Sequence, residues 1–289
     1  MKKLLLAFFL FLISSQVFSQ DDLLDILDAE APESNIEDIV TSTFKGTRIV
    51  NGHSIENKNN KELEFIIAHR FGRINTGFYD LFGLDNANIR FAFEYGVTDN
   101  LTIGVGRSSY EKTFDSFLKY SLIKQKRGEN LFPVAISFFG SAALKTLRDY
   151  DLADKRSFAE SLFYVGQVLI ARKFSQSFSF QLTPTYIHRN TVRVEADPHD
   201  IFALGFGARM KLSKRVSLNG EYFYTLNESR SINAVNSLAF GIDIETGGHV
   251  FQIILSNAIT MIEKSFISET TGNFFGGDIH LGFNLSRTF

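Results

Sequence analysis

The sequence predicts a transmembrane antiparallel β-barrel of about twelve strands. From residue 62 onward, segments of about ten residues alternate apolar with polar or charged side chains. A period of two places these two sets on opposite faces of a strand. A tilted strand of roughly ten residues crosses the hydrocarbon core of a membrane. Short and long connections also follow one another in turn, which is the arrangement of outer-membrane barrels, where the short turns are periplasmic.

The first 43 residues are expected to precede the barrel. Residues 1–19 have a basic start, an apolar run and Ser19 at the expected cleavage point, which are the features of a secretory signal peptide. Residues 20–43 carry eight acidic residues and no basic one. We interpret them as a solvated periplasmic leader. The alternative is a helical peptide that docks on a periplasmic partner or plugs the barrel.

The predicted barrel domain spans residues 44–289, and its first part is ambiguous. A strand over residues 48–55 would be a thirteenth and would break the even strand number of such barrels. We therefore assign this stretch to a periplasmic lead-in or to a segment folded into the barrel. The twelve predicted strands are 62–71, 87–96, 101–110, 114–124, 134–144, 162–172, 178–188, 202–212, 216–226, 238–246, 250–258 and a terminal strand within 278–289.

The predicted inward faces carry many ionisable groups, which separates this barrel from a soluble one. Burying so many unpaired charges in a packed core would cost several kcal/mol each. The residues expected to face a wet lumen and a solute are Arg90, Glu94, Asp115, Lys119, Arg209, Glu221, Asp243 and His280. The opposite faces are rich in Phe and Leu, and these faces are expected to contact outer-membrane lipid.

The terminal strand ends on Phe289, which resembles the signal that the barrel-assembly machinery recognises in Gram-negative bacteria. We expect this machinery as a partner and the outer membrane as the location. The chain has no Cys, which excludes disulfides and a lipid-anchored cysteine. Beyond residue 43 there are 28 basic and 24 acidic residues, without the clustering that nucleic-acid binding needs.

Two short clusters suggest catalysis, but neither has the expected geometry. His53 and Ser54, near Asn51, contain the residue types of barrel phospholipases, yet neighbours on a strand point to opposite faces. The run Asp197-Pro198-His199-Asp200 lies in a predicted external loop, where such residues are commonly solvated. No phosphate loop, haem-attachment motif or zinc spacing is present, so we expect no enzyme, cofactor or metal site.

The predicted external loop of residues 72–86 contains Tyr79, Asp80, Phe82 and Asp85. Its aromatic residues favour a loop that folds over or into the barrel, where it would form a constriction or a ligand platform. Packing on the barrel rim is the alternative.

Two runs resemble a family of Gram-negative outer-membrane β-barrels that is classed as a domain of unknown function. One run is residues 43–54, continuing to 69–72, and the other is residues 81–90, followed by 95–96 and 104–109. The resemblance covers nearly the whole chain after the leader. It implies an outer-membrane barrel, no established activity and no catalytic residues.

The charged lumen favours passive transport or binding of a small polar solute. A structural or partner-binding barrel without a conducting pore is the alternative, because twelve strands enclose a space that side chains can largely fill. An open pore predicts an unobstructed lumen, and a structural or partner-binding barrel predicts a plugged one.

Overall fold

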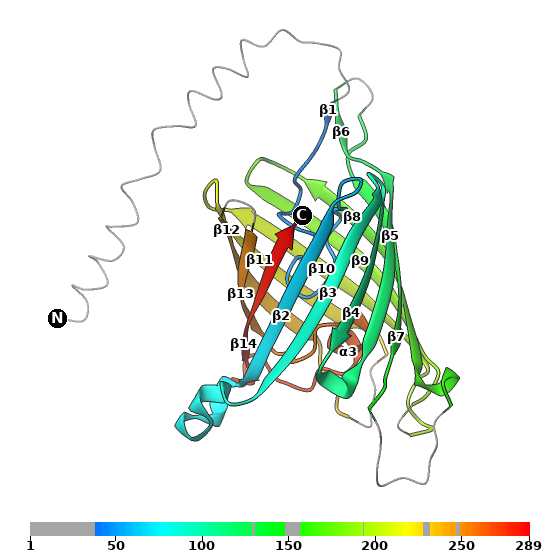
Figure 1. Ribbon diagram of the computed structural model, residues 1–289, viewed down its shortest axis with the longest axis vertical. Helices are drawn as coiled ribbons and strands as arrows, with labels where there is room; N and C mark the ends of the chain where they lie inside the picture. The colour runs from blue at the N-terminus through cyan, green and yellow to red at the C-terminus, as the bar shows by residue number, and fades with distance from the viewer. Residues whose placement is uncertain (1–37, 129–130, 148–156, 193, 228–231, 247–248) are drawn as a thin grey trace, which may run out of the picture. The chain divides into compact units, whose positions relative to one another are not determined.

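The computed structural model describes residues 38–128, 131–147, 157–192, 194–227, 232–246 and 249–289. Twelve antiparallel strands form a closed barrel in the order β10-β11-β12-β13-β14-β2-β3-β4-β5-β7-β8-β9 (Figure 1). Their bounds are β2 Leu63–Arg73, β3 Ala87–Thr98, β4 Leu101–Ser108, β5 Phe114–Ile123, β7 Ala135–Leu144, β8 Leu162–Lys173, β9 Phe178–Arg189, β10 Asp200–Lys211, β11 Val216–Thr225, β12 Ser237–Thr246, β13 His249–Ser256 and β14 His280–Thr288. The predicted all-β fold is confirmed. The predicted signal peptide, and the leader as far as Glu37, lie outside the described residues.

The barrel closes because the terminal strand pairs with the first barrel strand. Thr288 lies opposite Glu64, and the antiparallel register continues to His280 opposite Arg73, with an irregularity between His280 and Gly282. Beyond the ladder, the Phe289 amide donates to the Leu63 carbonyl at 2.8 Å. Closure leaves no unpaired strand edge in the hydrocarbon region, where unpaired backbone groups would each cost several kcal/mol.

The two faces of each strand differ as the alternation predicts. On β3, Phe91 and Phe93 are exposed on the outside, whereas Arg90 and Glu94 on either side of them are buried on the inside. Lipid solvates the apolar outer face, and the polar groups inside must find partners or water.

One short connection is extended by pairing with the chain that enters the barrel. In the β5–β7 connection, β6 (Lys126–Arg127) pairs antiparallel with β1 (Asp38–Ile39). The Val40 amide also donates to the Gln125 carbonyl at 2.9 Å. Figure 1 shows β1, β6 and the end of β14 at the same end of the barrel. This pairing explains why the link after β5 is longer than the other turns at this end, which we assign to the periplasm.

Helices occur in the connections between strands. They are η1 Ile74–Thr76, η2 Phe78–Gly83, η3 Tyr110–Lys112, η4 Ala159–Ser161 and α3 Glu263–Ser268. Over the part of the chain that the structure describes, none is long and apolar enough to cross a membrane.

Candidate functional site: the filled lumen

Residues 40–58, which we call the inner segment, run through the interior of the barrel. Main-chain atoms of this segment bind side chains from strands on different sides: Val50 binds β11 and β14, and Ser54 binds β5. The segment folds back on itself at residues 49–52, where the Ile49 amide donates to the Gly52 carbonyl at 2.9 Å. Of the two placements expected for residues 48–55, the structure therefore has the segment folded into the barrel.

The tip of this turn is bound by the carboxylate of Glu221 on β11. Glu221 accepts hydrogen bonds from the amides of Val50, Asn51 and Gly52, at 3.2, 2.9 and 3.0 Å from the nearest oxygen. Three amides converging on one carboxylate form a strong anion site, because each bond is assisted by charge. The turn is closely packed at Gly52, where a Cβ would lie 3.1 Å from the Phe223 ring.

Other wall side chains bind the main-chain carbonyls of the inner segment. Lys119 donates to Ser54 O at 3.1 Å and also to Glu56 O. Gln181 donates to His53 O at 2.8 Å and Gln252 to Ile49 O at 2.7 Å. Each of these strands supplies a polar group at the inward position that faces a backbone oxygen. The wall therefore holds the segment largely through polar contacts.

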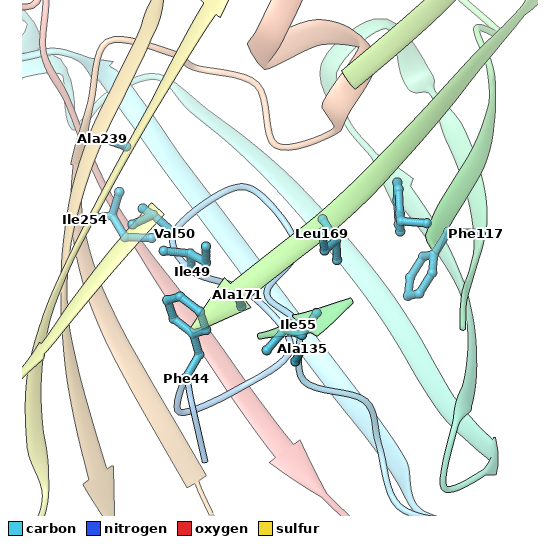
Figure 2. Packing of buried hydrophobic residues seen from close by; sticks show 11 residues of the cluster. Phe44, Ile49, Val50, Ile55, Phe117, Ala135, Leu169, Ala171, Ala239 and Ile254 are labelled. Atoms are coloured by element: carbon cyan, nitrogen blue, oxygen red, sulfur yellow. The ribbon is translucent and has the colours of Figure 1, made fainter. Parts of the chain in front are cut away.

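An apolar cluster packs the inner segment against the wall. Figure 2 shows Phe44, Ile49 and Val50 in this cluster, together with Leu169 of β8 and Ile254 of β13. All of these side chains are buried. Their burial favours the docked segment by the hydrophobic effect, so the attachment is not polar alone.

The structure places all eight predicted lumen residues on the inner face of the barrel. Their partners are protein groups. Lys119, Arg209 and Glu221 bind the inner segment, Arg209 through the carbonyls of Ser42 and Thr43 at 3.3 and 3.4 Å. The others bind wall groups or lie beside the inner segment: Arg90 pairs with Asp115 at 3.0 and 2.5 Å, Asp243 accepts from Asn219 at 2.6 Å, His280 lies 2.8 Å from Phe71 O, and Glu94 faces Arg48.

A second segment fills the lumen from the connection between β13 and β14. The alternation of short periplasmic turns and long loops predicts an external position for a long connection like this one, but all six residues of α3 are buried. Lys264 is bound by Glu111 and Glu269, both at 3.0 Å, and its ammonium lies 4.3 Å from the centre of the Phe163 ring. Burial alone would lower the pKa of Lys264, but the two carboxylates outweigh it and raise the pKa. The missed signal was the number of apolar residues in this connection, namely Met261, Ile262, Phe266 and Ile267, because a solvated loop has no need of them.

The inner segment and α3 meet at Arg48 and Glu263, whose Nη1 and Oε1 atoms are 2.9 Å apart. His53 Nε2 lies 3.6 Å from the same oxygen, and Arg48 Nη2 lies 3.6 Å from Glu94 Oε1. Among the described residues, neither the His53 ring nor the Glu94 carboxylate has a hydrogen-bond partner. Burial and then the charges of Arg48 and Lys119 lower the pKa of His53 well below its usual value, whereas burial raises the pKa of Glu263.

A family model described as "Membrane bound beta barrel domain (DUF5777)" matches residues 44–289. The chain belongs to this family. It is a β-barrel of the Gram-negative outer membrane. The matched region begins at Phe44, so most of the inner segment is part of the family domain. A comparison with curated proteins finds no match.

Several solved outer-membrane proteins are similar to this membrane-bound barrel to different degrees. The NanC porin is 8% identical, with a TM-score of 0.50 over 78% of this chain and 98% of that chain. The KdgM porin is 7% identical, with a TM-score of 0.44 over 79% and 99% of the two chains. An outer membrane channel from Pseudomonas putida F1 is 13% identical, with a TM-score of 0.48 over 80% and 96%. At these identities the likeness to NanC shows the fold alone.

The loop with Tyr79, Asp80 and Asp85 does not fold into this barrel. Tyr79 is 94% exposed, Asp85 is exposed and Asp80 is half-buried. Two features explain the difference from the expected constriction. The lumen already holds the inner segment and α3, and Gly83, at φ 86°, packs so closely on Gly72 that a Cβ would lie 2.5 Å from its carbonyl carbon.

The candidate catalytic residues do not converge on a shared site in this family member. Ser54 Oγ donates to Gly46 O at 2.6 Å, and the His53 ring instead packs between Phe117 and Phe139. Asp197 is buried, whereas Asp200 is exposed and binds Tyr186 and His188. No group of three or more potential metal ligands occurs within the described residues.

Proposed function

We propose that this barrel is a passage for a small polar solute that the inner segment holds closed. The observation that carries the proposal is the binding of the Val50–Gly52 amides by Glu221. Such bonds exchange with water at a modest net free-energy change when the lumen hydrates. Release of the segment would leave Glu221, Lys119 and Arg209 lining a wet, charged passage, and such charges select among small solutes.

The entry point of the inner segment supports release toward the periplasm. The segment follows β1, which pairs with β6 at the end of the barrel that carries the short turns. A movement of the chain at this end would draw the turn of residues 49–52 away from Glu221. No strand of the closed barrel has to separate for this movement.

A permanently filled, structural barrel is the second candidate function. It is favoured by the apolar cluster around Phe44, Ile49 and Ile254, because its exposure to a wet lumen would cost free energy. The buried ion cluster around Lys264 also favours it. In this case the external loops or a periplasmic surface would bind a partner and the lumen would not conduct.

A reversible disulfide distinguishes the two candidates, since the chain has no cysteine of its own. A Cβ added at Gly207 would lie 2.3 Å from Cδ1 of Ile49, an atom that Ile49→Cys removes, and 3.6 and 3.7 Å from Cγ1 and Cγ2. Both Cγ atoms are bonded to the Ile49 Cβ, so the two Cβ atoms would lie about 4 Å apart, within the roughly 3.5–4.5 Å of a disulfide. The double variant Ile49→Cys/Gly207→Cys would thus tie the inner segment to β10.

The measurement is conductance in a planar bilayer, with each single-cysteine variant as a control. The proposed function predicts openings in the reduced double variant, none after oxidation, and recovery after reduction. Both single variants should conduct in either condition. Silence of the folded protein in every state, including a variant that lacks the Glu221 carboxylate, would exclude the passage and favour the structural barrel.

A further inference from the structure

A cavity at the periplasmic end of the barrel lies between the β5–β7 connection and the β8–β9 turn. Its volume is about 460 Å³, which is in the range of small-molecule sites. Basic side chains from both connections line it: Lys126 and Arg127 from β6, and Arg172 and Lys173 from the end of β8. Among the described residues, no carboxylate lines this cavity. Its chemistry is therefore that of an anion site.

Two of these cations are available to a ligand. Within the described residues, the guanidinium groups of Arg127 and Arg172 form no ion pair and no hydrogen bond, although both main chains are paired in the sheets. Arg172 instead lies over the Phe174 ring, 5.0 Å from its centre. A guanidinium stacked on an aromatic ring keeps its N–H donors free at the edge, where a phosphate can accept two of them.

The surroundings of the cavity indicate a ligand with an apolar part. Phe174 and Leu131 line the cavity and are more than half exposed. Arg172 is exposed and lies on the same outward face of β8 as Tyr164. It is the last outward residue of the strand, so it lies at the end of the lipid-facing surface. Phe174 also packs against Phe178, with ring centres 5.9 Å apart. Aromatic rings and basic groups at this level are typical of the membrane interface.

We propose that this cavity binds the phosphate of an anionic phospholipid in the periplasmic leaflet of the outer membrane. Arg127 and Arg172 hold the phosphate, and the exposed faces of Leu131 and Phe174 contact the glycerol and the first acyl carbons. The proposal does not depend on conduction. A soluble phosphate ester presents the same anionic group, and the experiment separates it from a lipid.

The absence of Trp from the chain allows a local probe. The variant Leu131→Trp carries one fluorophore at the cavity and is refolded into phosphatidylcholine vesicles. These vesicles contain increasing fractions of brominated phosphatidylglycerol or, separately, of brominated phosphatidylcholine. Bromine quenches only a nearby Trp, so the two titrations compare the occupancy of the site by each lipid. We expect half of the quenching at a fraction of brominated phosphatidylglycerol about tenfold lower than the fraction of brominated phosphatidylcholine that gives the same effect. The reason is that each basic residue strengthens attachment to anionic lipid severalfold.

Charge variants test whether the cavity itself makes this distinction. In the double variant Arg127→Gln/Arg172→Gln, the fractions of the two brominated lipids that give half-quenching should differ by no more than about twofold. The matched control is Lys214→Gln/Arg215→Gln, which removes the same charge from exposed positions in the β10–β11 turn. This control should keep the preference. Circular dichroism of each variant checks that the barrel is folded.

Three results would overturn the proposal. Equal quenching by the two lipids would mean that the cavity does not select an anionic headgroup. If Lys214→Gln/Arg215→Gln lost the phosphatidylglycerol preference to the same extent, the general positive charge at this end of the barrel would be what attracts the lipid. Loss of the phosphatidylglycerol preference on adding millimolar glycerol phosphate would mean that the site takes a soluble phosphate ester. Retention of the preference in glycerol phosphate supports the lipid.

Discussion

Arg48 and Glu263 form an ion pair 2.9 Å long inside the barrel, although 215 positions separate them in the chain. Arg48 lies on the inner segment and Glu263 begins α3, so this pair joins the two segments that fill the lumen. A change in one segment is therefore felt by the other. The pair also lies beside His53 and Glu94, so the junction gathers several ionisable groups from the inner segment, α3 and β3.

Breaking this pair should loosen the inner segment. Arg48→Met leaves Glu263 buried without its cation, which typically costs about 3–5 kcal/mol. Hydrogen exchange of a peptide covering residues 40–58 should then accelerate by at least a hundredfold. The double variant Arg48→Met/Glu263→Leu removes both charges and should recover most of the protection. A double variant as unprotected as the single one would show that the two residues are not energetically coupled.

Replacing the carboxylate that binds the turn should release its tip. Glu221→Gln leaves one oxygen acceptor for three amides and turns an NH2 group toward N–H donors. We expect the free energy of docking the turn to fall by about 1.5–3 kcal/mol. Faster exchange of the Val50, Asn51 and Gly52 amides measures this effect. Asp243→Asn is the matched control, because Asp243 accepts from wall side chains. Comparable exchange in both variants would argue against a special role of Glu221.

Acidic pH should weaken docking of the inner segment through His53. Burial lowers the pKa of His53 in the docked state, so below about pH 6.5 the undocked ring binds a proton that the docked ring does not. Docking therefore loses about 1.4 kcal/mol for each pH unit below 6.5, until the pH reaches the docked-state pKa. The pKa values of Glu56 and Glu263 are raised by burial, so these groups act in the opposite direction as the pH falls.

The variant His53→Phe isolates this contribution. Its ring can take the place of the imidazole, which lies 4.4 and 4.3 Å from the centres of the Phe117 and Phe139 rings. Glu56 and Glu263 remain in the variant, so their effects cancel when the two pH profiles of hydrogen exchange are subtracted. The difference should grow between pH 6.5 and 5.5. Parallel profiles would show that His53 does not contribute to the pH dependence.

Removing the buried ammonium of α3 should free the β13–β14 connection. Lys264→Met leaves the carboxylates of Glu111 and Glu269 close together without their shared cation, and we expect a loss of about 3–5 kcal/mol in docking of α3. Protease cleavage within residues 257–272 gives the measurement. Lys145→Met is the control, because Lys145 also binds Glu111, at 2.6 Å, but lies outside this connection. Similar cleavage in both variants would assign the effect to Glu111 alone.

The barrel itself follows from local patterns in the sequence. A strand between lipid and a polar interior needs apolar side chains on one face and polar ones on the other, and this requirement acts on every pair of neighbouring residues. Arg90 and Glu94 alternate with the outward Ile89, Phe91, Phe93 and Tyr95, and this alternation identifies β3 and its register without any knowledge of its neighbours. Strand number, location and the inward positions could be predicted for the same reason.

The contents of the lumen were decided by the tertiary structure. The same residues 48–55 suit a lead-in or a folded-in segment, and the choice depends on Glu221, Gln252 and Asn284, which lie far away in the chain. The filled interior in turn leaves no place for the loop around Tyr79, which extends outward instead. Alternation along a strand tells which side chains face inward, whereas the groups that they meet there depend on packing between distant segments, and no local pattern records it.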